Sequence, residues 1–194
     1  HELLQAIAEG VPDGSQVALL SRLEPPSWLA RMRAEGRLFE LGAADLAFDD
    51  DESHRLLDSL GVPLSGDQAA ELVRRAEGWP VGLYLMALSL QTRGEPAWTD
   101  TSMAPSGSDR FVVDYLRAEV LAGLPRRARD FLRRTSILDE FDASVCDAVM
   151  GRHDSAAVLG GLGRQLQLVV TLDGEGHRYR YHHLLADALR ADLE

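Results

Sequence analysis

The chain has 194 residues, which is enough for one compact domain or two small ones. Hydrophobic residues make up 45% and charged residues 26%, a balance typical of a globular protein, and no apolar run reaches the roughly 18 to 20 residues that cross a bilayer. The formal net charge of -11 opposes non-specific binding of nucleic acid, so such a role would need a local basic patch.

All 20 basic residues are Arg. A phosphate-binding Walker Lys, a Schiff-base Lys and a general-base Lys are therefore excluded within this chain. The single cysteine, Cys146, excludes a disulfide framework and a Cys-based zinc site, and it favours a cytoplasmic location. The first ten residues lack the basic start and long apolar core of a signal peptide, and the start at His1 suggests a piece of a longer protein.

Apolar residues recur with a helical period along most of the chain, and Gly, Pro or acidic residues mark the ends of these segments. The pattern predicts helices at 1–10, 28–36, from Asp49 onward, 66–77, 79–90, 112–124, around Phe131 to Leu138, 144–151, 154–164 and 184–193. Segment 79–90 is apolar on nearly every face, which is typical of a helix buried in a small helical subdomain. Six acids against one Arg in 45–58 indicate a solvated helix start rather than a metal site. Residues 92–109 are rich in Pro, Gly, Ser and Thr and predict a linker.

Short apolar runs predict the strands. Residues 16–22 are bounded by turn residues, which suits a strand buried on both faces of a parallel sheet, and Arg22 stands where this strand ends. Residues 38–41 predict one more short strand. Residues 166–172 and 177–183 flank a Gly-containing turn and predict a β-hairpin. Helices followed by a hairpin are the element order of a winged-helix module.

The sequence lacks the common catalytic motifs. No Ser lies in a G-x-S-x-G elbow and no H-E-x-x-H or paired-carboxylate motif is present, so we expect no independent catalytic site, and Cys146 is expected to be a buried core residue. Adjacent histidines on a strand point to opposite faces, which argues against a metal site at His182 and His183. Two interpretations of this pair stay open. One His caps the final helix while the other packs, or one of them contacts an anion at the helix N-terminus.

The arginines also allow two interpretations. Arg22 is either a surface residue or a bidentate phosphate ligand beyond the end of a strand. Residues 110–134 hold seven Arg against three acids, and Arg178 and Arg180 lie on the predicted wing. This patch is the best local argument for DNA contact, but a solvated, ion-paired helix face is the favoured interpretation in such acidic surroundings.

Five ordered segments carry a family resemblance. They are SRLEPPSWLARMRAEGRLFELGAADLAF (21–48), AEGWPVGLYLMALSL (76–90), SDRFVVDYLRAEVL (108–121), FLRRTSILDEFDASVCDAVMG (131–151) and YRYHHLLADALR (179–190). Together they resemble the MalT-like, LuxR-type transcriptional activators, which belong to the STAND signal-transducing ATPases. The resemblance runs nearly from end to end, and five blocks with their spacing are more specific than any single motif.

The resemblance implies a mainly helical fold with a helical subdomain, a winged-helix subdomain and a short remnant of an α/β nucleotide-binding sheet at the N-terminus. The implied boundaries are 1–48 for the C-terminal remnant of the NTPase domain, 49–98 for the helical subdomain, 99–109 for a linker and 110–194 for the winged helix. The family's phosphate-binding loop and Mg-binding acidic strand lie upstream, in agreement with the absence of Lys. Its helical-repeat sensor and its promoter-binding helix-turn-helix also lie outside these segments.

The resemblance also implies which residues contact nucleotide. Arg22 is similar to the sensor Arg that detects the terminal phosphate. Trp79 and Pro80, which follow Gly78, resemble the G-x-P element whose proline packs near the adenine. The implied ligand is ATP or ADP, with Mg supplied by the upstream part.

One histidine of the pair would be the winged-helix residue that holds the ADP diphosphate in the resting state. Either His182 or His183 fits this role, and the segment YRYHHLL departs from the motif of the better-known eukaryotic relatives. The winged helix of such switches is regulatory, which argues against Arg178 and Arg180 as DNA contacts.

We therefore expect the nucleotide-sensing switch region of a bacterial transcription regulator, without ATPase activity or DNA recognition of its own. Its expected partners are nucleotide, the rest of its own polypeptide and, in the active state, further copies of itself, with promoter DNA reached only through the helix-turn-helix and no membrane contact. The alternatives are a free-standing winged-helix DNA-binding protein and a hydrolase that uses His182 or His183. A Walker loop upstream and a helix-turn-helix downstream in the full gene would exclude both.

Overall fold

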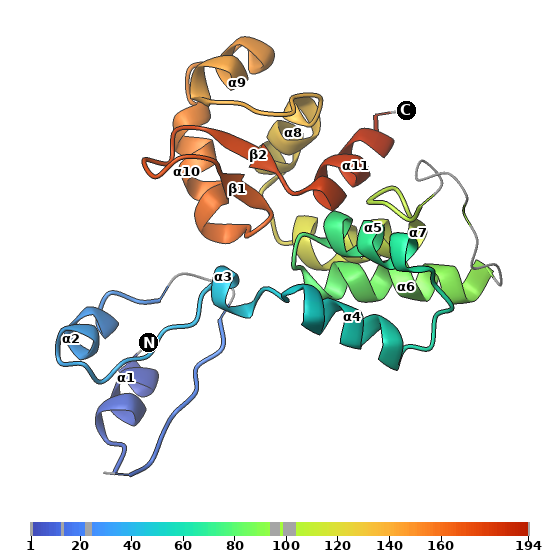
Figure 1. Cartoon of the computed structure of the whole chain (residues 1–194). Helices are drawn as coiled ribbons and strands as arrows, with labels where there is room; N and C mark the ends of the chain where they lie inside the picture. Colours follow the sequence, from blue (N-terminus) through green and yellow to red (C-terminus); the bar gives the residue numbers. More distant parts are fainter. Residues whose placement is uncertain (1, 13, 22–24, 94–97, 99–103, 194) are drawn as a thin grey trace. The chain divides into compact units, whose positions relative to one another are not determined.

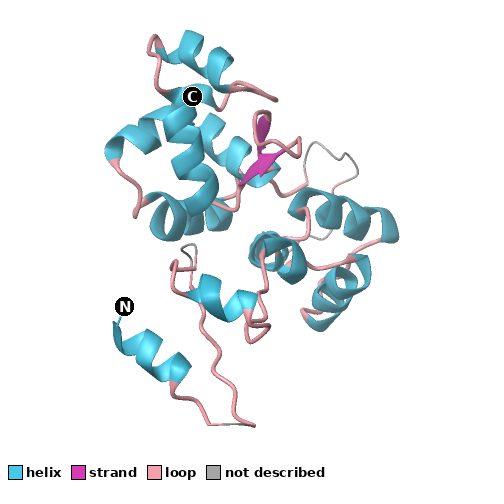
Figure 2. Cartoon of the chain, turned by 90° about the vertical axis from the view of Figure 1, so that its left-hand side faces the viewer, coloured by secondary structure: helices cyan, strands magenta, loops and turns pink. Residues whose placement is uncertain are grey.

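The computed structural model describes residues 2–12, 14–21, 25–93, 98 and 104–193. The described part is mainly helical, and its one sheet is a two-stranded hairpin (Figures 1 and 2). The chain divides into two compact units, His1–Gly42 and Ala43–Glu194, which are taken here one at a time.

The first unit contains two short helices, and both were predicted. Helix α1 spans Glu2–Glu9 and helix α2 spans Leu29–Ala34. The amide of Gly10 donates to the carbonyl of Ala6 and closes α1, while Gly36 adopts a positive φ of 68° just beyond α2. Glycine is the residue that adopts this left-handed conformation without a steric penalty, so the helix ends where the sequence indicates.

The strands predicted for the first unit are not formed. Residues 16–21 and 38–41 are irregular, and across the described residues of this unit no strand ladder is present. Val17 is 43% exposed, Leu20 93% and Phe39 84%. The expected sheet remnant at the N-terminus is therefore wrong for the described residues. An apolar run becomes a strand only when neighbouring strands satisfy its backbone and cover its faces.

The second unit begins with four helices. They are α3 (Ala43–Leu46), α4 (Asp50–Ser59), α5 (Gly66–Ala76) and α6 (Pro80–Arg93). Asp49 and Glu52 form a capping box at the start of α4, and Ser65 and Gln68 form another at the start of α5. Helix α6 is central to the core as predicted, because Leu83 and Met86 are fully buried.

A widened turn interrupts the next predicted helix. Helix α7 spans Arg110–Tyr115 and continues as the π-helical segment η2 (Leu116–Leu121), in which the amide of Ala122 donates to the carbonyl of Arg117. The apolar residues here recur every four positions, which exceeds the 3.6 residues of an α-helical turn. A π turn absorbs the excess, so Leu116 and Leu124 both remain buried.

The remaining elements follow the predicted order. They are α8 (Arg126–Thr135), α9 (Ala143–Met150), α10 (Ser155–Gln165), β1 (Val169–Thr171), β2 (Tyr179–Tyr181) and α11 (His183–Ala191). The strands pair antiparallel with Val170 opposite Arg180, which confirms the hairpin.

Helix α11 lies at the centre of the core of the second unit, because it packs against α5, α7 and α8 (Figure 1). Leu184 and Leu185 are fully buried. Two glycines allow close approach to this helix: an added Cβ would lie 1.9 Å from the carbonyl oxygen of Leu184 at Gly107 and 2.7 Å from the Leu184 side chain at Gly82. Part of the predicted linker is therefore packed tightly on α11.

Candidate functional site

The structure brings together four of the five residues predicted to contact nucleotide. Arg22 lies outside the described residues. Trp79 precedes α6 and Pro80 begins it, while His182 and His183 stand at the start of α11. The rings of Trp79 and His182 meet edge to face with centroids 5.7 Å apart. The end of α5, the start of α6 and the start of α11 therefore share one small region of the molecule.

His182 is 5% exposed and caps α11. Its Nδ1 accepts from the amide of Leu184 at 3.2 Å, so Nε2 carries the proton and donates to the carbonyl of Ala76 at 2.9 Å. Burial lowers the pKa of His182 and the Glu77 carboxylate opposes that effect only in part. His182 is therefore a neutral imidazole, and both of its ring nitrogens are bonded to the protein.

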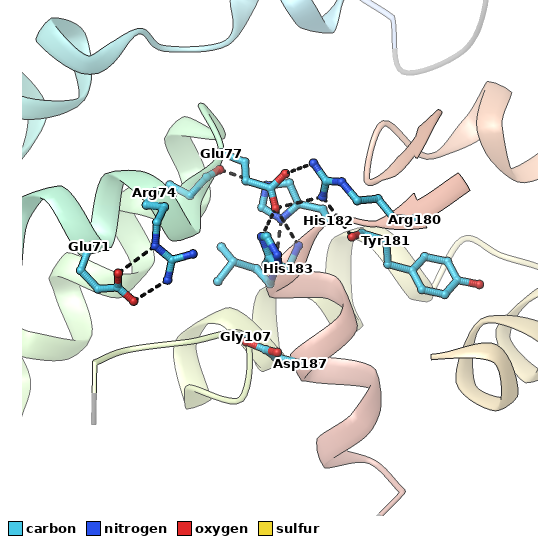
Figure 3. Close-up of polar contacts among 11 residues, drawn as sticks. Glu71, Arg74, Glu77, Gly107, Arg180, Tyr181, His182, His183 and Asp187 are labelled. Carbon is cyan, nitrogen blue, oxygen red and sulfur yellow. Dashed lines mark hydrogen bonds and ion pairs between the residues drawn. The ribbon is translucent and has the colours of Figure 1, made fainter. Parts of the chain in front are cut away.

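The Glu77 side chain also lies at the start of α11, with contacts to Arg180 and His183 (Figure 3). Its carboxylate accepts from both terminal nitrogens of Arg180, at 2.6 and 3.2 Å, and from the amide of His183 at 3.0 Å. It also pairs with Nδ1 of His183. Burial would raise the pKa of Glu77, but the bonds from Arg180 and the His183 amide outweigh it and hold the pKa below the ordinary value.

These contacts make a reciprocal cap between two helices that are distant in sequence. His182 satisfies a carbonyl at the end of α5, and Glu77 satisfies an amide at the start of α11. Such terminal groups lack partners within their own helices. We call Ala76, Glu77, Arg180, His182 and His183 the reciprocal cap.

Glu77 was missed in the sequence, although one local signal was available. It ends α5 in the left-handed conformation, with φ 47° and ψ 40°. A carboxylate at a helix C-terminus opposes the helix dipole, and a left-handed backbone disfavours every residue with a Cβ. An acidic residue directly before Gly78 at a helix end is therefore unusual, and it indicates that the side chain has a distant partner.

An open hollow of about 450 Å³ lies beside His183. It is bounded by helix α5, the 104–109 loop and α11, and Arg74, Arg75, Arg190, Ser106 and Ser108 line it. The arginines are engaged by protein groups: Arg74 and Arg75 bind Glu71, and Arg190 binds Asp139. Arg74 and Arg75 together lower the pKa of Glu71 to about 2, against the effect of burial.

The arginines of the hairpin are ion-paired. Arg178 contacts Glu140, and Arg180 contacts Glu77. In the Arg-rich segment, Arg117 contacts Asp192. These pairs fit the solvated, ion-paired face that the sequence favours over a DNA-binding patch.

The single cysteine lies in the core. Cys146 is fully buried, and burial raises the pKa of its thiol to about 12, so the reactive thiolate is not available at neutral pH. Across the described ranges, no group of three or more His, Cys, Asp or Glu is arranged to hold a metal ion. Within the same ranges, no helix is both long and apolar enough to span a membrane.

The C-terminal part of the chain is a winged-helix domain. A family model described as the MalT winged helix domain matches residues 117–194, which hold α8 to α11 and the hairpin. The HTH-type transcriptional regulators MalT of Vibrio campbellii and Vibrio cholerae are each 30% identical over 190 residues, and MalT of Yersinia enterocolitica is 30% identical over 191. These alignments cover 97%, 97% and 98% of this chain and 21% of each relative.

The chain is thus homologous to the MalT transcriptional regulators over about 97% of its length and contains a MalT winged helix domain. The resemblance inferred from five sequence segments is confirmed. The chain spans about a fifth of the length of the curated relatives it matches, 21% in each case.

Proposed function

We propose that this chain is the ATP/ADP-sensing switch region of a MalT-type, LuxR-family transcriptional regulator. The observation that carries the proposal is the ring contact between Trp79 and His182, which stands directly before His183. The family resemblance assigns these residues to the adenine and phosphate ends of one nucleotide. A fold that brings them together at the starts of two different helices, α6 and α11, supports a shared ligand.

We assign residues 1–48 to the end of the nucleotide-binding domain, 49–98 to the helical subdomain, 99–109 to a linker and 110–194 to the winged helix. The exposed apolar side chains of Leu20 and Phe39 support a first segment that other parts of a larger protein cover. Because the chain has no Lys, the phosphate-binding loop and the Mg site would come from upstream. The chain would not hydrolyse ATP by itself.

His183 is the better candidate for the phosphate contact. Both nitrogens of His182 are occupied inside the protein, whereas the His183 side chain is 58% exposed and borders the hollow. The first two amides of α11 are already bonded to Glu77 and to Nδ1 of His182, and Nδ1 of His183 pairs with Glu77, so a phosphate would meet His183 at its Nε2. Trp79 and Pro80 would lie toward the adenine, and the role of Arg22 at the terminal phosphate stays a prediction from the family resemblance, since Arg22 lies outside the described residues.

The mechanism would be a shift between two populations. ADP would hold the winged helix against helices α4 to α6 in a resting form, and ATP with an inducer would favour an open form that self-associates. Promoter DNA would be bound by a separate helix-turn-helix, and the regulator would act in the cytoplasm. The ion pairs of Arg178 and Arg180 argue against the rival in which this winged helix itself reads DNA.

Calorimetric titration of the complete gene product with ADP and with AMP tests the proposal. Because the second phosphate would accept a hydrogen bond from His183, ADP should bind at least about tenfold more tightly than AMP, which corresponds to roughly 1.4 kcal/mol. Equal affinity for the two nucleotides, or no binding of either, would contradict a nucleotide-sensing role.

A further inference from the structure

Two connections join the winged-helix segment, residues 117–194, to the preceding helices of the same unit. The covalent connection runs from α7 through the π-helical η2 into α8. The non-covalent connection is formed by α11, which packs on α5 and α7 and also meets Gly82 of α6 and Gly107, and by Arg180 of β2, which contacts Glu77. The reciprocal cap lies at this second connection, and Figure 3 shows Glu77 between Arg180 and His183 there.

Glu77 is locally unfavourable on two counts. Its backbone is left-handed, a conformation that glycine adopts more easily, and its charge opposes the dipole at the end of α5. Neither feature helps α5 itself. The compensating contacts come from residues far along the chain: Arg180 lies 103 positions after Glu77 and His183 lies 106 positions after it. The presence of a Glu at this position is therefore accounted for by its contacts with the winged-helix segment and not by any benefit to α5.

The carboxylate is well placed to hold that junction. The side chain of Glu77 is 16% exposed and that of Arg180 28%, so water screens the pair only weakly. The bond geometry is bidentate at the guanidinium, and a third bond comes from the helix amide. Charge-assisted bonds of this kind are stronger than neutral ones.

The covalent connection has the properties of a hinge. In η2 the Ala122 amide bonds to the Arg117 carbonyl, five residues back. Such π turns are points at which helices bend, and they occur frequently at functional sites. The π turn begins at Leu116, one residue before the winged-helix match starts.

We propose that Glu77 is the latch of a conformational device: its bonds to Arg180 and the His183 amide close the winged-helix segment onto α5, and the segment turns about η2 when they are lost. This inference rests on the proposed function, because it assigns a residue to the transition between closed and open forms. The latch itself needs no nucleotide.

The chain offers two matched controls. Glu140 pairs with Arg178, which directly precedes strand β2, and both residues belong to the winged-helix segment. Glu71 lies on α5, has a side chain only 11% exposed, and pairs with Arg74 and Arg75 of the same helix. Neither carboxylate forms an ion pair across the junction in these contacts.

Electron–electron distance measurements between two spin labels test the proposal. The labels are placed by Asp58→Cys in α4 and Ala148→Cys in α9, in a Cys146→Ala background without nucleotide. The parent, Glu71→Gln and Glu140→Gln should share one distance distribution. Glu77→Gln should add a longer distance, with the open-to-closed ratio raised roughly ten- to a hundredfold.

A second variant separates the latch from a folding defect. Glu77→Gly removes the carboxylate while easing the left-handed backbone, so it should open the junction without harming α5. If Glu77→Gln and Glu77→Gly both keep the parent's distance distribution, the latch is wrong. Because this measurement contains no nucleotide, its outcome is independent of the ADP titration: an open Glu77→Gln chain supports the latch even if ADP binding fails.

Discussion

The imidazole of His182 donates a hydrogen bond to the carbonyl of Ala76, 106 positions earlier in the chain, at 2.9 Å. The donor is an N-cap residue of α11 and the acceptor is the last residue of α5, so one side chain serves the ends of two helices. A residue in this position is expected to affect the stability of the fold more than the affinity for a ligand.

Replacement of His182 by Ala should lower the free energy of unfolding by about 2 to 4 kcal/mol, because it removes a helix cap, creates a cavity and removes one of the two hydrogen bonds to the Ala76 carbonyl, the other coming from the Trp79 amide. Urea unfolding monitored by circular dichroism measures the change. His177→Ala is the control, since the His177 side chain is 74% exposed and should change stability by less than about 0.5 kcal/mol. Equal stability of the two variants would show that His182 is not structural.

The low pKa of His182 predicts a pH dependence. Burial disfavours the imidazolium, with His183 and Arg180 adding to the effect and Glu77 opposing it, so the unfolded chain takes up the proton at higher pH than the folded one. The free energy of unfolding should therefore fall as the pH drops below about 6.5. His182→Asn keeps a capping side chain that does not titrate, and its stability should change less between about pH 7 and pH 5. Parallel pH profiles of the two proteins would contradict the assignment.

Glu71 should control stability at lower pH. Its pKa is lowered to about 2 by Arg74 and Arg75, so its contribution is present above the ordinary carboxyl pKa and is lost as the pH falls toward 2. Because Arg74 is largely exposed, we expect Glu71→Gln to cost about 1 to 2 kcal/mol at neutral pH. Unfolding free energies measured across the acid range should converge for the two proteins at about pH 2. A constant difference would show that ionisation of Glu71 is irrelevant.

The packing of the 104–108 loop on α11 predicts opposite effects for two glycine substitutions. Gly107→Ala would place a Cβ 1.9 Å from the backbone oxygen of Leu184, so the loop or the helix must shift, and a loss of about 2 kcal/mol or more is expected. Gly161 lies inside α10 with open space around its Cβ position. There an Ala should stabilise the helix by about 0.5 to 1 kcal/mol. Thermal melting of both variants would measure this contrast, and a neutral Gly107→Ala would refute the close contact.

Local features were predictable where their physical cause is local. The helix starts near Asp49 and at residue 66, the apolar character of α6 and the turn of the hairpin all depend on residues within a few positions of each other. The strand predicted at 16–22 is not formed over 16–21, because strand formation depends on neighbours that the sequence pattern does not specify.

Only part of the reciprocal cap could be predicted from the sequence. The histidine pair was found from its position before the last helix, but its two members could not be distinguished, since which of them is buried depends on how α11 meets α5. Glu77 was missed altogether because its partners lie at the other end of the chain. Pairings between distant helix ends leave almost no periodic signal in a sequence.

The most direct test of the nucleotide-sensing account is the ADP affinity of the complete gene product with His183→Ala, measured by calorimetry against His177→Ala. His183 would contribute a hydrogen bond to a phosphate, so its loss should weaken ADP binding by roughly five- to a hundredfold, while His177→Ala should bind like the unaltered protein. If His183→Ala retains full ADP affinity and only melts at a lower temperature, His183 is a structural residue and the phosphate contact proposed for it is wrong.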